Sequence, residues 1–139
     1  MKKITSIQNT FIKSLILLRE KSKSRDRSDV FLVEGKKEIL LALKGNYQID
    51  IVLFCSKICT IHEVEKISEK FKIIEINKKI YDKISYRNTT EGVIGIAKKQ
   101  DLSLSKLQLG KNPLILVAES IEKPGNLGAV LRTADAANV

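Results

Sequence analysis

The chain has 139 residues, which is enough for one domain with a substantial hydrophobic core and too few for two full domains. Hydrophobic residues make up 43% and charged residues 29%, as in an ordinary soluble globular protein, whereas 5% aromatic residues and no Trp argue against base stacking as the main mode of binding. The net charge of +9 favours a polyanionic partner, because Lys and Arg side chains that contact phosphates release counterions.

The positive charge is concentrated near the N-terminus. Residues 1–37 carry ten basic and four acidic side chains, a local charge of +6. A general bias towards lysine, as in an AT-rich genome, is the alternative explanation of the charge. A basic end followed by a nearly balanced body instead indicates a localised surface for nucleic acid, although any single member is by default a solvated side chain. The candidate RNA-binding residues are Lys13, Lys21, Lys23, Arg25, Arg27, Lys36 and Lys37.

The hydrophobic pattern predicts an amphipathic helix over residues 7–21. Phe11, Leu15 and Leu18 recur at the spacing of one helical face. Residues 21–29 contain no apolar side chain, and we expect them to form the most basic loop of the chain.

From residue 30 onward, short strands and short helices alternate. Gly45 and Asn77 are expected to cap two of the helices. This alternation implies a mostly parallel sheet that is covered on both faces. The predicted strands are 30–35, 50–55, 72–76 and 92–99, and the predicted helices are 36–44, 61–71 and 77–85. This first domain, residues 1–100, is followed by a polar linker over residues 101–112.

Residues 113–139 are predicted to form one strand–turn–helix unit. The continuous apolar run 113–120 is typical of a buried parallel strand, and the Ala-rich segment 127–137 is helical in composition. Pro124, Gly125 and Gly128 indicate a tight turn between them. One such unit cannot bury its own strand, so we expect it to be the start of a truncated domain.

The two cysteines do not form a disulfide framework, and no segment is typical of export or of a membrane span. We therefore expect a cytoplasmic protein with no membrane partner. Cys55, Cys59 and His62 are three potential zinc ligands within eight residues. A structural zinc site usually needs four ligands, and the sequence offers no second pair, so we predict no metal.

The segment Glu119–Thr133 contains the strongest motif of the chain. It places a glycine-rich turn between a predicted strand and a helix, where backbone N–H groups and the helix dipole favour anions. Asn126 lies at the turn and Arg132 within two helical turns, so both can face one cleft at the carboxyl edge of a sheet. The spacing matches neither a dinucleotide fingerprint nor a P-loop. The alternatives are a purely structural turn and, more distantly, a phosphate cradle of a nucleotide-binding α/β protein.

The pattern E-x-x-x-x-P-x-N-x-x-A-x-x-R-T resembles motif 1 of the SpoU/TrmH family of RNA ribose methyltransferases, which have the knotted α/β fold of the SPOUT class. Its fixed positions are all met, at Glu119, Pro124, Asn126, Ala129, Arg132 and Thr133. The resemblance implies methyl transfer from S-adenosylmethionine to a ribose 2′-hydroxyl of rRNA or tRNA. It also implies that Glu119, Asn126 and Arg132 are catalytic, with Asn126 ordering the site and Arg132 helping to activate the hydroxyl. Because a guanidinium stays charged at neutral pH, Arg132 can stabilise an alkoxide or steer a phosphate more easily than it can act as a base.

Three further segments, residues 6–13, 31–38 and 90–97, resemble the substrate-binding domain that often precedes the methyltransferase in this family. That domain is similar to the α/β/α sandwich of ribosomal proteins that bind kinked RNA. The resemblance implies that residues 1–100 bind RNA and that residues 113–139 begin a SPOUT-type domain. Arg87 and Asn88, in a loop before the last predicted strand, are weaker candidates for RNA contact.

The cofactor pocket of the family is formed by later motifs, whose residues lie beyond residue 139. We therefore expect this chain to bind RNA, but neither to bind S-adenosylmethionine nor to turn over. By the same resemblance, the full-length enzyme is expected to be a homodimer. The rival hypothesis is a stand-alone RNA-binding module related to the kink-turn-binding ribosomal proteins, in which Asn126 and Arg132 have no role.

Overall fold

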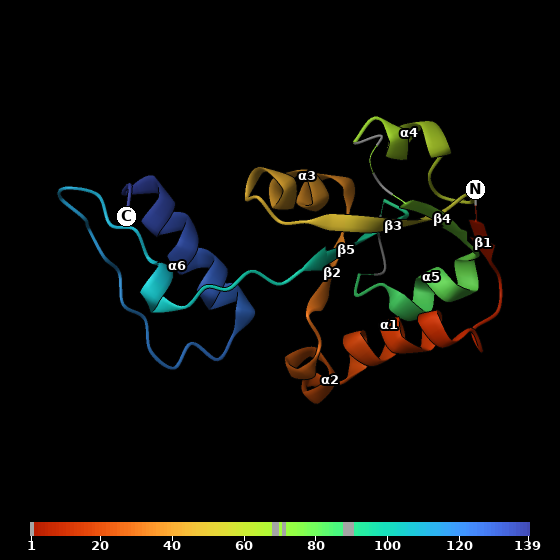
Figure 1. The fold of residues 1–139 in the computed structure, drawn as a ribbon, viewed down its shortest axis with the longest axis horizontal. Helices are drawn as coiled ribbons and strands as arrows, with labels where there is room; N and C mark the ends of the chain where they lie inside the picture. The colour runs from red at the N-terminus through yellow and green to blue at the C-terminus, as the bar shows by residue number, and fades with distance from the viewer. Residues whose placement is uncertain (1, 68–69, 71, 88–90) are drawn as a thin grey trace. The chain divides into compact units, whose positions relative to one another are not determined.

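The computed structural model describes residues 2–67, 70, 72–87 and 91–139. It divides into two compact units, Met1–Gln100 and Asp101–Val139 (Figure 1). The strands are β1 (Lys2–Ile4), β2 (Val30–Glu34), β3 (Ile49–Cys55), β4 (Lys72–Ile76) and β5 (Val93–Lys98). The helices of the first unit are α1 (Thr10–Glu20), α2 (Ser22–Arg27), α3 (Lys36–Lys44), α4 (Ile61–Glu65) and α5 (Lys78–Ile84). The second unit contains a short 3-10 helix, Leu104–Lys106, and α6 (Pro124–Ala136).

The five strands form one sheet in the order β1-β4-β3-β5-β2. β4 pairs in parallel with β1 and β3, whereas β5 pairs antiparallel with β3 and β2. The prediction of a mostly parallel sheet is therefore wrong, since half of the pairings in the described part of the chain are antiparallel. The cause is the connection from α5 to β5. The N–H groups of Tyr86 and Arg87 donate to the Glu34 carboxylate at the end of β2, and Glu34 pairs with Ile94 at the start of β5.

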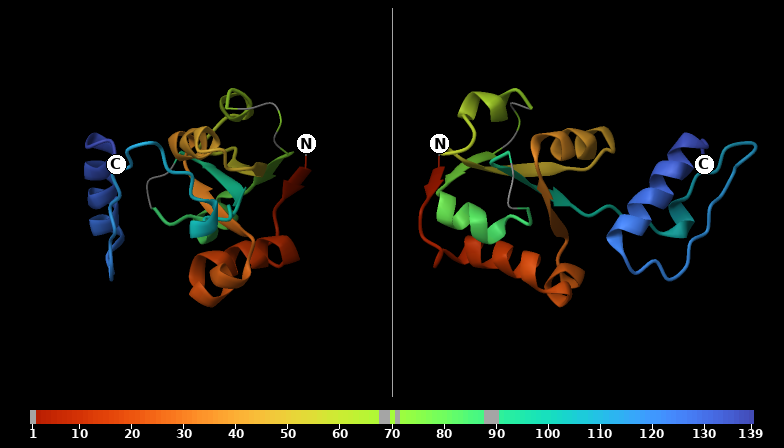
Figure 2. Two further views of the ribbon diagram at one scale, coloured as in Figure 1. Left: turned by 60° about the vertical axis from the view of Figure 1, so that its left-hand side comes forward. Right: turned by 180° about the vertical axis from the view of Figure 1, so that it is seen from behind.

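The sheet is covered on both faces, as predicted, because its central strands alternate. In β3, Leu53 and Cys55 belong to the hydrophobic cluster that includes α1 and α5. Val52 and Phe54 belong to the second cluster, which includes α3 and α4. Figure 2 shows these two pairs of helices on opposite sides of the sheet. The first unit is thus a three-layer α/β/α sandwich, the architecture expected from the sequence.

Polar caps set where several helices begin. The Asn9 side chain accepts hydrogen bonds from the N–H groups of Phe11 and Ile12, so α1 begins at Thr10 rather than at residue 7. Asn77 caps α5 as predicted, by accepting from the Ile80 N–H. Gly45 ends α3 as predicted, since its N–H donates to the Leu41 carbonyl.

Two predicted elements differ from the structure, and one strand was not predicted. Residues 22–27 form α2 instead of a loop, because packing against α1 holds a segment that has no apolar pattern of its own. The predicted helix 61–71 is shorter: α4 ends at Glu65, and residues 68, 69 and 71 lie outside the described part. β1 was not predicted, since only three residues pair with β4.

The second unit lacks the predicted strand. Residues 113–120 form no strand, and Leu114, Ile115, Leu116 and Val117 are exposed. No partner strand is available among the described residues of this unit, so the run cannot join a sheet. The helix begins at Pro124, which means that Gly125 and Gly128 lie inside α6 rather than in a tight turn before it. No helix in the described residues is both long and apolar enough to cross a membrane.

Candidate nucleic-acid interface

The structure divides the predicted basic surface into two groups at opposite ends of β2. Lys13 lies on α1, and Lys21, Lys23, Arg25 and Arg27 lie at or within α2, before the strand begins. Lys36 and Lys37 follow its carboxyl end. Five residues of strand separate the two groups by about 16 Å, at roughly 3.3 Å per residue. The predicted residues therefore do not form one compact patch.

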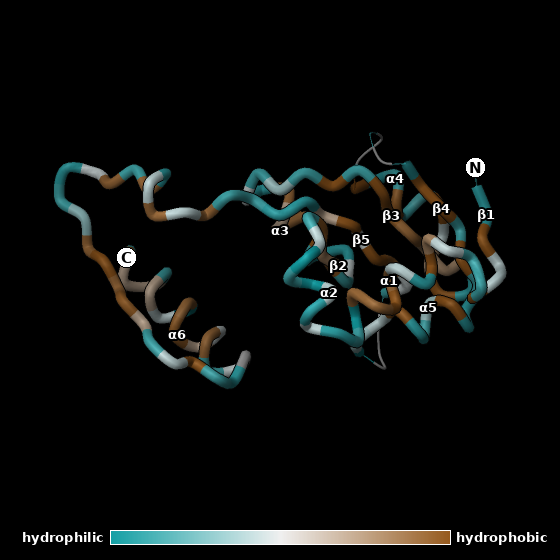
Figure 3. The backbone as a smooth tube through the Cα atoms, turned by 60° about the horizontal axis from the view of Figure 1, so that its bottom comes forward, coloured by the Kyte–Doolittle hydropathy of each residue, from teal (hydrophilic) through white to brown (hydrophobic). Residues whose placement is uncertain are grey.

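The α2 group combines exposed cations with one cation that holds the local structure. Figure 3 shows α2 as a hydrophilic stretch of the chain. Lys21, Lys23 and Arg27 are exposed. Arg25 Nη1 donates to the carbonyl oxygens of Leu18, at 3.2 Å, and Arg19, at 3.0 Å, and so satisfies the last turn of α1. This contact holds α2, which has no hydrophobic pattern of its own, against the end of α1.

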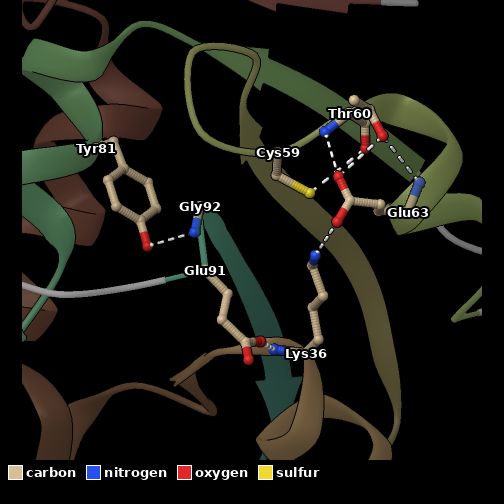
Figure 4. A network of polar contacts seen from close by, with 7 residues as sticks. All are labelled: Lys36, Cys59, Thr60, Glu63, Tyr81, Glu91 and Gly92. Carbon is tan, nitrogen blue, oxygen red and sulfur yellow. Dashed lines mark hydrogen bonds and ion pairs between the residues drawn. The ribbon is translucent and has the colours of Figure 1, made fainter.

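At the other end of β2, Lys36 is held by an acidic partner on α4 (Figure 4). Its Nζ lies 2.5 Å from Glu63 Oε1. Glu63 also accepts hydrogen bonds from the N–H and the hydroxyl of Thr60, at 2.8 and 2.9 Å, in a capping box at the start of α4. The contact therefore links α3 to α4 across one face of the sheet.

The charges of this network stabilise one another. The hydrogen bond to Glu63 raises the pKa of Lys36. Hydrogen bonds from Lys36, and then from Thr60, lower the pKa of the Glu63 carboxyl from 4.5 to about 2. Both groups are therefore charged over the whole physiological range. Lys36 already has a partner within the protein, whereas Lys37 is exposed, and RNA contact by either stays a prediction.

The segment before β5 is tied to the start of α3. Glu91 Oε2 accepts a hydrogen bond from the Lys36 N–H, and the Gly35 N–H donates to the Val93 carbonyl at 3.0 Å. Gly35 has φ 109°, a conformation that favours glycine. The resemblance over residues 31–38 and 90–97 thus includes residues that join two distant segments. Asn88 and Thr90 lie outside the described part.

Sequence reasoning missed the acidic residues that organise this edge. Glu34, Glu63 and Glu91 each accept backbone or ammonium hydrogen bonds from segments that are far away in the sequence. The capping-box spacing of Thr60 and Glu63 was the one local signal that could have identified part of the network. Positive charge alone identified the candidates but not their partners.

The possible zinc ligands do not form a cluster. Cys55 and Cys59 are buried free thiols, and burial raises the pKa of Cys59. The His62 side chain is 89% exposed and faces Glu65 instead. In the part of the chain that the structure describes, no group of three His, Cys, Asp or Glu side chains could hold a metal ion.

The three predicted catalytic residues lie in the second unit and are exposed. Glu119 precedes α6, Asn126 lies in its first turn and Arg132 in its middle. Six residues along an α-helix leave Asn126 and Arg132 about 120° apart around its axis, because each residue turns by roughly 100°. No hydrogen bond or ion pair joins the three in the described part of the chain, so their convergence on one cleft stays a prediction.

One groove of the second unit lies beside α6. It is lined by Leu116, Ala129, Val130, Thr133, Ala134, Ala137 and Val139. These side chains are aliphatic except for one hydroxyl, so the groove holds no charged group to match the carboxylate and ammonium of such a cofactor.

Comparison with known proteins identifies the first unit. Residues 9–95 match the family model of the MRM3-like substrate binding domain. The chain is 31% identical over 117 residues to human rRNA methyltransferase 3, mitochondrial, covering 79% of this chain and 27% of that protein. It is 29% identical over 139 residues to the Bacillus subtilis 23S rRNA (guanosine(2553)-2′-O)-methyltransferase RlmP, covering 100% of this chain and 52% of that protein.

Solved structures show the same relationship. An RNA 2′-O ribose methyltransferase is 36% identical, with a TM-score of 0.77, and the match covers 97% of this chain and 52% of that one. An rRNA methyltransferase from Sinorhizobium meliloti with bound AdoMet is 27% identical, with a TM-score of 0.72, and the match covers 98% of this chain and 51% of that one. The chain thus spans about half the length of these relatives, and about a quarter of the human one.

Proposed function

Because this chain belongs to the SpoU/TrmH family and carries an MRM3-like substrate-binding domain over residues 9–95, we propose that its first unit binds ribosomal RNA. The family match is the observation that carries the proposal, since it extends from the cap of α1 into β5 and so includes nearly the whole sandwich. The relatives from human and Bacillus subtilis are both named as rRNA methyltransferases. Ribosomal RNA is therefore favoured over transfer RNA as the substrate class.

We propose that the whole protein transfers a methyl group from S-adenosylmethionine to a ribose 2′-hydroxyl of that RNA. Asn126 and Arg132, with Glu119, are the proposed catalytic residues, Arg132 as a stabiliser of negative charge. In this proposal, residues 1–100 bind RNA, residues 101–112 are a linker, and residues 113–139 begin the methyltransferase domain. A homodimer and a cytoplasmic location stay predictions for the whole protein.

The proposed RNA surface is the exposed part of the basic set. Lys21, Lys23 and Arg27 lie at or within α2, Lys13 lies in the first turn of α1, and Lys37 lies beyond the far end of β2. Contacts from such side chains go mainly to phosphates and orient the RNA without reading its sequence. The aromatic-poor composition fits this mode, because it offers few rings for base stacking.

Binding of a 23S rRNA transcript to the 139-residue chain tests the proposal. We expect the triple variant Lys21→Gln, Lys23→Gln, Arg27→Gln to bind more weakly. The slope of log K against log salt should fall by about 0.7 to 0.9 for each phosphate that the variant no longer binds. The matched control neutralises Lys44, Lys57 and Lys66, three exposed lysines away from α2. Equally weakened binding in the two triple variants would show that net charge, not the α2 surface, drives binding.

A further inference from the structure

A polar pocket of about 260 Å³ lies in the first unit between α1 and α5. It is lined by Arg19, Lys78, Asp82, Ser85 and Arg87. Of these five residues only Arg87 is a predicted RNA contact, and the charge pattern of the sequence did not single out the others. Ser85 is 6% exposed, so the pocket reaches a buried side chain at the end of α5.

The lining carries three cations and one carboxylate. Lys78 Nζ binds both carboxylate oxygens of Asp82, at 2.6 and 2.8 Å, so this pair is internally neutralised. Arg87 Nη1 binds Glu38 Oε1 at 3.0 Å, outside the pocket lining. No ion pair joins Arg19 to a carboxylate in the described residues. The uncompensated positive charge of the pocket therefore belongs to Arg19.

Arg19 is held in place but incompletely hydrogen-bonded. The Tyr86 hydroxyl donates to the Arg19 carbonyl at 2.8 Å, and Arg19 Cζ lies 5.7 Å from the centre of the Tyr86 ring. Its Nε is buried and has no hydrogen-bond partner among the described residues. Buried donors are nearly always paired, so the Arg19 guanidinium keeps hydrogen-bonding capacity that the described residues do not use.

An anion of phosphate type is the acceptor that matches this arrangement. A guanidinium presents its N–H groups in a planar fork that suits two oxygens of one phosphate, and a second cation nearby strengthens the contact. The pocket is also next to the proposed RNA surface, because Arg25 of α2 donates to the carbonyl of Arg19. An RNA strand bound along α2 would therefore pass the end of α1 and reach the pocket.

We propose that this pocket binds one backbone phosphate of the RNA, with Arg19 as the main ligand and Arg87 and Lys78 as supporting cations. The assignment rests on the proposed function for the RNA as the source of the phosphate. Asp82 opposes the bound anion, and its pairing with Lys78 limits the positive charge of the empty pocket. The sign of the Asp82 effect separates a binding role of the pocket from a purely structural one.

The test measures binding of a 23S rRNA transcript to the 139-residue chain and to four single variants. We expect Arg19→Gln and Arg87→Gln to weaken binding, Arg19→Gln by about tenfold, as for loss of a hydrogen bond to a charged group. Asp82→Asn is expected to tighten binding by a few fold, because it removes a repulsive charge and releases Lys78. Lys83→Gln is the matched control: it removes one charge from the exposed side of α5 without touching the pocket, and we expect an unchanged affinity.

Thermal unfolding of each variant shows whether the fold is intact, and Arg19→Lys, which keeps the charge but lacks the Nε–H, is expected to bind with intermediate affinity. If Arg19→Gln does not fold, the RNA affinities of Asp82→Asn and Arg87→Gln test the proposal in its place. Wild-type affinity in Arg19→Gln, or no gain in Asp82→Asn, would overturn the proposal while the RNA-binding function stands.

A titration with inorganic phosphate, followed by the NMR signal of the Arg19 Nε–H, separates the two sources of the anion. A shift with phosphate and with the transcript supports the pocket. A chain that binds no transcript overturns the proposed function and the RNA source together, and a missing shift with both ligands overturns the anion site itself.

Discussion

The Glu91 carboxylate accepts a 2.6 Å hydrogen bond from the backbone N–H of Lys36, although 55 positions separate the two residues. This contact places a negative charge at the positive end of α3 and satisfies an N–H that has no partner within the helix. Together with the contact between Gly35 and Val93, it joins the start of α3 to the start of β5. An anionic ligand at this helix end would therefore compete with a residue of the protein.

Replacing Glu91 with Ala should destabilise the first unit by about 1 kcal/mol, because the Lys36 N–H is left without its acceptor. Glu91→Gln should cost less, since an amide oxygen can still accept the bond. Urea unfolding followed by circular dichroism measures both. Glu20→Ala, which removes an exposed carboxylate of α1, serves as the control. A destabilisation of the control as large as that of Glu91→Ala would mean that the hydrogen bond contributes nothing specific.

Acid should weaken the contact between Lys36 and Glu63. The pKa of Glu63 is about 2 in the folded protein, below its usual value of 4.5, so the stability that it contributes is complete above pH 4.5 and is lost as the pH falls from 4.5 towards 2. In Glu63→Gln this contribution is absent at every pH. The melting temperatures of the two proteins should therefore differ most above pH 5 and converge near pH 2, and parallel curves would contradict the assignment.

Gly92 should not tolerate a side chain. It has φ +76°, and a Cβ there would lie 2.8 Å from Ile58 Cβ and 3.1 Å from Cys59 Cβ. We expect Gly92→Ala to lower the unfolding free energy by about 2 kcal/mol through backbone strain and close contact. Gly110→Ala is the matched control, since a Cβ at Gly110 meets no atom within 4 Å. Urea unfolding compares the two variants, and equal stability would show that the backbone at Gly92 relaxes.

Residues 1–100 are predicted to fold and to bind the 23S rRNA transcript without the second unit. Both hydrophobic clusters consist entirely of residues in this range, so residues 1–100 contain a complete core of their own. The melting temperature and the RNA affinity of the shortened protein should match those of the 139-residue chain. A much weaker affinity with an intact fold would instead place RNA contacts in residues 101–139.

Calorimetry with S-adenosylmethionine should show no heat of binding to the 139-residue chain. The groove beside α6 is aliphatic and lacks charged groups for the cofactor. The same titration with a longer protein that includes the family's later motifs is the positive control. Measurable binding to the 139-residue chain would show that residues 113–139 contain a cofactor site that neither the motif nor the groove predicts.

The sequence predicted those parts of the fold that depend on local pattern. Apolar runs identified β2 to β5, and Asn77 and Gly45 identified helix ends, because burial and capping act between near neighbours. The direction of β5 depends on Glu34 binding the N–H groups of Tyr86 and Arg87, more than 50 residues away. The hydrophobic periodicity of the sequence carries no information about such a long-range contact. The alternation of strands and helices therefore predicted a mostly parallel sheet.

The candidate site shows the same limit. Charge counting identified the exposed lysines around α2, but it treated Lys36 like the others, because its partner Glu63 lies 27 residues further along the chain. Arg19 was not among the candidate RNA-binding residues, because it lies within a predicted amphipathic helix, where a single Arg is ordinary. Its unpaired Nε becomes visible only when Tyr86 and α5 pack beside it.

The position of β5 has a consequence for the order of folding. β5 is the last strand of the sheet in the chain, yet it lies between β3 and β2, and β2 pairs with no other strand in the described residues. During synthesis, about 60 further residues must therefore be added after β2 before its partner β5 is present. Until then its open edge is exposed, and contacts of such long sequence separation form slowly. Variants that slow the docking of β5 should aggregate during expression even when the finished protein is stable.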